Sequence, residues 1–173
     1  MTKPLNDFSG WLNFFWVGCL LSMAFSFLGV IGMAVTLFIF LFSFDLNIAI
    51  ASAVSLLIFI ILSFLYYRIV KMLEQKNVNN PNAIVSKLCK IIMVNLLGYV
   101  SYYFLAPLLK NESSELHFVL AEWRNLVITG ISSMSMKRVL TNLLINIFWI
   151  LYFFRSKRVA AYYGANATKL SLR

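Results

Sequence analysis

The stretch that decides the fold is residues 8–44, FSGWLNFFWVGCLLSMAFSFLGVIGMAVTLFIFLFSF, which contain no Asp, Glu, Lys or Arg. A bilayer core about 30 Å thick is crossed by about 20 helical residues that each rise 1.5 Å. No polar break divides the stretch into two spans, although Gly29 and Gly32 allow a bend. We therefore predict one long or tilted helix over residues 12–41, followed by a tight turn.

The rest of the chain is also too apolar for a soluble protein. Of its 173 residues, 61% are hydrophobic and 12% are charged, whereas soluble domains carry about 25% charged residues. Three more uncharged stretches follow, and the last is short enough to need the long stems of Lys137, Arg138 and Arg155 to reach the interfaces. The sequence predicts an all-α integral membrane bundle, a single domain with four transmembrane helices over residues 12–41, 47–67, 89–109 and 136–154.

The placement of the basic residues predicts the orientation. The connecting segments are then a loop at 68–88, an opposite loop at 110–135 and a tail at 155–173. Of the 15 Lys and Arg residues, 11 lie in the N-terminus, in the 68–88 loop together with the adjoining Lys90, and in the tail, and such residues concentrate on the cytoplasmic side. Both termini are expected in the cytoplasm. The basic excess also attracts anionic lipid headgroups, so nucleic acid is not expected as a partner.

Two connecting segments have recognisable patterns. Residues 75–82 read QKNVNNPN, and this composition favours turns over a continued helix. In the outer loop, apolar residues recur at three- and four-residue spacing, which is typical of a short amphipathic helix along the membrane surface. These residues are Leu116, Val119, Leu120, Trp123 and Leu126.

The polar residues expected at lipid depth are neutral. Gly18, Ser22 and Ser26 recur every four residues and predict a packing stripe on the first helix, with Ala49 and Ala53 as a matching stripe on the second. The amides at this depth are Asn95, Asn142 and Asn146. Hydrogen bonding between helices is one interpretation of these amides, and a polar substrate path is the other.

The sequence lacks residues arranged for catalysis, proton transfer or metal binding. Every acid lies in a predicted turn, loop or terminus, so a proton-coupled transporter has no intramembrane carboxylate. His117 is the only histidine, and Glu115 and Glu122 do not share its helical face at ligand spacing. No nucleophile elbow or phosphate-binding loop occurs. We expect a protein that is not an enzyme and that has no cofactor or metal.

Two short motifs carry a family resemblance. The chain enters its first helix with Gly10-Trp11-Leu12, and residues 148–159 read FWILYFFRSKRV. These motifs resemble the YdgK-like family of small bacterial inner-membrane proteins, a domain of unknown function. Leu151 stands where that family usually has proline. The resemblance implies four helices in a bacterial plasma membrane and no established catalytic residues.

The second motif has the properties of an interfacial anchor. Trp149 and Tyr152 suit the headgroup level, and the residues that follow them favour anionic lipid or a docked partner. These following residues are Arg155, Ser156, Lys157 and Arg158.

Two functions agree with this sequence. The first is a multi-pass protein that acts by binding, as an accessory subunit of a membrane complex or as a self-associating bundle. The alternative is a small uncoupled transporter or lipid-handling protein. Its polar path would be lined by Asn95, Ser101, Asn142 and Asn146.

Overall fold

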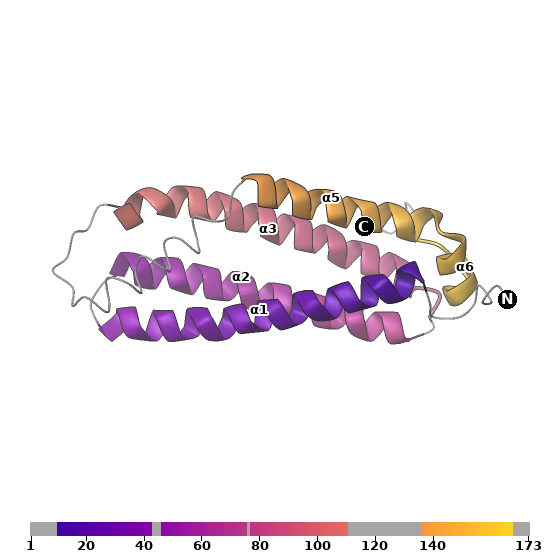
Figure 1. The fold of residues 1–173 in the computed structure, drawn as a ribbon, viewed down its shortest axis with the longest axis horizontal. Helices are drawn as coiled ribbons and strands as arrows, with labels where there is room; N and C mark the ends of the chain where they lie inside the picture. Colours follow the sequence, from indigo (N-terminus) through magenta and orange to yellow (C-terminus); the bar gives the residue numbers. More distant parts are fainter. Residues whose placement is uncertain (1–9, 43–45, 76, 111–135, 168–173) are drawn as a thin grey trace.

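The computed structural model describes residues 10–42, 46–75, 77–110 and 136–167. All secondary structure in these residues is helical. Figure 1 shows the long helices running alongside one another, with a short helix at one end of the bundle. The helices are α1 (Trp11–Phe42), α2 (Leu46–Glu74), α3 (Asn80–Lys110), α5 (Met136–Arg155) and α6 (Lys157–Tyr163).

The lengths of the helices confirm a helical protein suited to a membrane. Three helices in the described residues are long and apolar enough to cross a bilayer, over 31, 29 and 26 residues. The number of candidate spans rises to four if α5 and α6, which meet at a bend of 64°, are counted as one broken span. Since about 20 residues cross the hydrocarbon core, α1, α2 and α3 must tilt or extend beyond it.

The first helix is one unbroken element, as predicted, and it packs along α2. Trp16 Nε1 donates to Glu74 Oε1 at 3.4 Å near one end of this pair, and Phe40 shares a buried cluster with Ile48 near the other. Between these ends the two helices approach closely. A Cβ atom added to Gly29 would lie 2.7 Å from the ring of Phe59, so only glycine leaves room for that ring.

The connection between α2 and α3 is shorter than the predicted loop at 68–88. Both helices continue past their predicted spans, and only residues 75–79 lie between them. The Asn80 side chain donates from Nδ2 to the backbone oxygens of Met72 and Gln75, each at 2.7 Å, so it binds carbonyl groups exposed at the end of α2. Pro81 lies in the first turn of α3, where proline's missing N–H costs nothing. The turn was predicted correctly, but its extent was not.

The tail folds against the end of the bundle. Ser156 caps α6, with its Oγ accepting from Val159 N at 3.4 Å. Tyr163 then donates its hydroxyl to Leu73 O at 3.2 Å, which ties α6 to the end of α2. Ala167 N donates to Phe153 O at 3.1 Å. The predicted tail at 155–173 is therefore a structured cap over residues 157–167.

The best-packed core lies beneath this cap. Residues from α1, α2, α3, α5 and α6 are fully buried there and form one cluster. Its members with no exposed surface are Leu12, Ile69, Leu73, Ile84, Val85, Ile91, Phe153 and Val159. The outer loop, with its predicted amphipathic helix and His117, lies outside the described residues.

Candidate functional site

Aromatic rings join the start of α1 to the end of α5. The ring centroids of Phe15 and Trp149 are 4.5 Å apart, and those of Phe15 and Phe153 are 5.4 Å apart. Trp11 lies 6.3 Å from Trp149. Trp149 is only 8% exposed, so the predicted interfacial ring packs against other helices and is not open at the surface. The first turns of α1 cover it.

The rest of the predicted docking motif divides between the interior and the surface. Tyr152 is half-buried, and its hydroxyl has no hydrogen-bond partner among the described residues. Arg155 and Lys157 are exposed. Arg158 is half-buried and lies beside the backbone of Gly10, whose φ of 64° is left-handed. Of these residues, Arg155 and Lys157 are therefore the ones that remain fully at the surface.

The three predicted amides gather between α3 and α5. Asn95, Asn142 and Asn146 line one narrow gap between these helices. Asn146 is 7% exposed and donates from Nδ2 to Asn142 O at 2.7 Å. The side chains of Asn95 and Asn142 form no hydrogen bond to any described residue. They therefore keep free donors and acceptors, so the amides are not the interhelical hydrogen bonds that were one interpretation of the sequence.

The predicted small-residue stripe contacts α2 in part, because the Ser22 hydroxyl forms a hydrogen bond with Tyr66 on α2. Ser22 and Ser26 donate their hydroxyl groups to the carbonyls of Gly18 and Ser22, at 2.8 Å each. Ser26 is buried, but no atom lies within 4 Å of a Cβ added to Gly18. On α2, Ala49 is buried and Ala53 is exposed, so they do not form a matching stripe. The close approach of α1 to α2 is at Gly29 instead.

The open side of Gly18 faces a cavity of about 240 Å³. This cavity combines residues from both predicted sets with others that we did not predict. The missed residues on α1 share one helical face with Ser22 and Ser26, which is the pattern that points to them in the sequence. The lining residues are Phe14, Phe15, Gly18, Cys19, Ser22, Tyr66, Leu88, Asn142, Ile145, Asn146 and Trp149.

The cavity opens toward the outside between α1 and α5. In Figure 1, α1 runs beside α2, and α5 runs beside α3. Phe14 and Ile145 line the cavity and are also 63% and 50% exposed. Because α1 and α5 meet mainly through their aromatic rings at one end, the cavity is open at the surface between these two helices.

The lining of the cavity is uncharged and partly polar. None of the described lining residues is charged, and the polar ones are the hydroxyl groups of Ser22 and Tyr66 and the amides of Asn142 and Asn146. The described part of the chain also has no cluster of three His, Cys, Asp or Glu residues that would hold a metal. Hydrogen bonding and apolar contact are the interactions that this cavity offers.

Comparisons of this chain with protein-family models, curated proteins and solved structures gave no match. The YdgK-like resemblance therefore stays a prediction from the two motifs.

Proposed function

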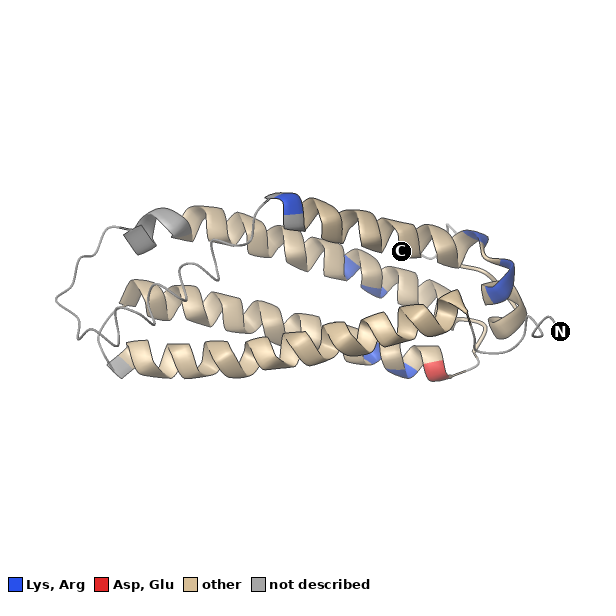
Figure 2. Cartoon of the chain, in the orientation of Figure 1, with Lys and Arg blue, Asp and Glu red and all other residues tan. Residues whose placement is uncertain are grey.

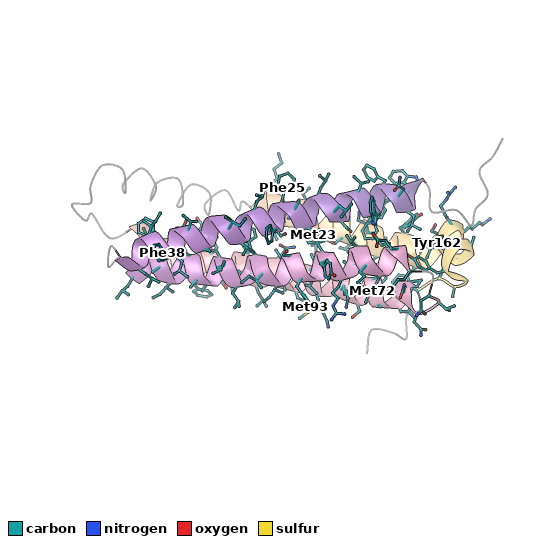
Figure 3. All side chains as sticks on the ribbon, turned by 90° about the horizontal axis from the view of Figure 1, so that it is seen from below. Met23, Phe25, Phe38, Met72, Met93 and Tyr162 are labelled. Carbon is teal, nitrogen blue, oxygen red and sulfur yellow. The ribbon has the colours of Figure 1, made fainter. Side chains whose placement is uncertain are left out.

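We propose that this chain is a non-enzymatic multi-pass membrane protein that acts by binding, as an accessory subunit of a membrane complex or as a small self-associating bundle. The observation that supports the proposal is the exposed outer side of α1. Its large side chains Phe25 and Leu28 are 69% and 61% exposed. Figure 3 shows Phe25 on the outside of the bundle. An aromatic ring offers a large apolar area for contact with a partner.

The proposal includes four spans and a cytoplasmic position for α6. On this view α1, α2, α3 and α5 cross a bacterial inner membrane. Figure 2 shows that most described Lys and Arg residues lie toward the α6 end of the bundle. Cations in short loops mark the cytoplasmic side, and anionic lipid headgroups there are the expected partners of the exposed Arg155 and Lys157.

The orientation predicts how introduced cysteines react. In a variant with Cys19 and Cys89 replaced by alanine, a cysteine at Asn79 should be protected in intact cells from a membrane-impermeant thiol reagent. A cysteine at Ser114 should be labelled, because the 110–135 loop is then outside. Permeabilised cells provide the control, since both sites should react there. Labelling at Asn79 alone in intact cells would reverse the proposed orientation.

The binding function predicts an association that depends on the outer side of α1. After extraction in mild detergent, the protein should migrate as a defined oligomer or with a stoichiometric membrane-protein partner. The double change Phe25→Ala and Leu28→Ala should weaken this association at least tenfold. Phe104→Ala is the matched control, because Phe104 on α3 is 70% exposed. A single copy without a partner, or equal losses in both variants, contradicts the proposal.

The cavity favours a second candidate function. A small uncoupled transporter or lipid-handling protein needs a neutral polar site that membrane components reach from the side. Asn142 and Asn146 supply such groups, whereas Asn95 lines only the narrow gap behind them. Ser101 lies elsewhere, in a separate small cavity between α2 and α3, so the polar path that we predicted is not continuous among the described residues.

A further inference from the structure

The cavity between α1 and α5 has the depth, polarity and opening of a lipid site. We propose that it binds the polar end of an uncharged lipid that carries both a hydroxyl group and an ester carbonyl, as a monoacylglycerol does. This inference rests on the second candidate function and names its ligand class. It is independent of association through the outer side of α1.

The depth of the cavity is fixed by contacts between helices. Glu74 on α2 lies level with Trp16 on α1, and Tyr66 precedes Glu74 by a helical rise of about 12 Å. Within the sequence, Tyr66 and Leu88 line the cavity close to the cations Arg68 and Lys87. These are among the innermost cations at the α6 end, and such cations mark the boundary between hydrocarbon and headgroups. The cavity therefore begins at the level of these cations and extends inward along α5 as far as Asn142.

The polar groups of the cavity can pair with a ligand that has both a hydrogen-bond donor and a hydrogen-bond acceptor. The Asn142 amide has no hydrogen-bond partner among the described residues, so its Nδ2 is free to donate to a carbonyl oxygen. Asn146 uses Nδ2 on the backbone, which leaves Oδ1 to accept from a hydroxyl group. A ligand with an ester carbonyl and a hydroxyl group satisfies both amides.

The absence of charge among the described lining residues selects against lipids with a charged headgroup. A phosphate or ammonium group placed there loses its hydration without gaining an opposite charge, which is costly. A quinone head has carbonyl oxygens but no hydroxyl donor, so it leaves Asn146 Oδ1 unpaired. An acylglycerol meets neither objection.

The size and opening suit a lipid head whose chain remains in the bilayer. The volume of about 240 Å³ accommodates a glycerol ester. Phe14 and Ile145 border the open side. The acyl chain would leave between them and continue along the outer surface of the bundle.

Photocrosslinking tests this site directly. The full chain is placed in phosphatidylcholine vesicles with a monoacylglycerol that carries a diazirine near its ester. We expect saturable crosslinks, mapped by mass spectrometry to α1 near residues 14–22 and to α5 near residues 142–149. An excess of unlabelled monoacylglycerol should abolish them. Phosphatidylglycerol and decylubiquinone at the same excess should leave them unchanged.

Two glycines on α1 offer a matched pair of variants. Gly18→Leu places a side chain in the cavity, and Gly32→Leu makes the same change outside it. A Cβ atom at either position meets no atom within 4 Å, and leucine is the better helix former. Both variants should therefore fold. Crosslinking should fall at least tenfold in Gly18→Leu and remain at the wild-type level in Gly32→Leu.

A second pair tests the hydrogen bonds. Asn142→Leu should reduce crosslinking severalfold, whereas Asn95→Leu should not, because Asn95 does not line this cavity. Equal crosslinking of the Gly18→Leu and Gly32→Leu variants overturns the site. Competition by phosphatidylglycerol or decylubiquinone as strong as that by monoacylglycerol overturns the ligand class. Either result leaves the association test on α1 unaffected, so the two proposals fail separately.

Discussion

Replacing Phe153 with alanine is expected to lower the free energy of unfolding by about 3–5 kcal/mol. Phe153 has no exposed surface, and its ring lies 5.4 Å from that of Phe15. It belongs to the core beneath α6, at the end of the bundle that we place beyond the hydrocarbon. Apolar surface uncovered there meets water, so the loss combines hydrophobic transfer with an empty cavity.

The measurement is reversible unfolding in mixed micelles, followed by circular dichroism. Leu151→Ala is the matched control on the same helix, because Leu151 is 48% exposed and its loss should stay within about 0.5 kcal/mol. If both variants lost the same stability, Phe153 would not be part of a packed core, and the cap formed by α6 would have to be reconsidered.

Leucine at Gly29 should be almost as damaging. The Cβ atom alone would lie 2.7 Å from the Phe59 ring, so either the ring or the helix must move. Overpacking of this kind costs about 1–3 kcal/mol and occasionally more. Inside the bilayer no hydrophobic force offsets the loss, since helices associate there through close packing. We expect the α1–α2 pair to separate at lower denaturant concentration.

Gly32→Leu separates this effect from the loss of a glycine as such. It lies one turn further along α1 and has open space around its Cβ position, so it should be neutral or slightly stabilising by helix propensity. An equally destabilised Gly32→Leu variant would show that backbone flexibility, and not contact with Phe59, explains the result at Gly29.

The sequence predicted the long elements of the fold well. The uncharged stretch from 8 to 44 specified α1 to within one residue at each end. It specified the turn before α3 less well, because Asn and Pro favour both turns and the first residues of helices. Pro81 and the caps made by Asn80 let α3 begin there. Arg68 and Lys87 did not end the helices, because a helix can continue through charged residues once it has left the lipid.

The site was harder to predict because α1 is apolar all round. Such a helix gives no pattern that separates the lipid-facing side from the packed side. Trp149 was predicted as an anchor at the headgroup level, and nothing in the sequence indicated that other helices bury its ring. Gly18 and Gly29 look alike in the sequence. The structure separates them, because Gly29 packs against Phe59 and Gly18 borders the cavity. The sequence nevertheless placed Asn146 correctly on a face turned toward the bundle, whereas Asn142, predicted on the same face, is exposed.

The contact between Phe15 and Trp149 also constrains biogenesis. Trp149 leaves the ribosome about 130 residues after Phe15, a delay of about 7–26 s at about 5–20 residues per second. The α1–α2 hairpin has local partners and can assemble early. During the delay the aromatic face of α1 that Trp149 later covers must be shielded by lipid or by the insertion machinery. Slowing translation between α3 and α5 should therefore increase degradation of the nascent chain.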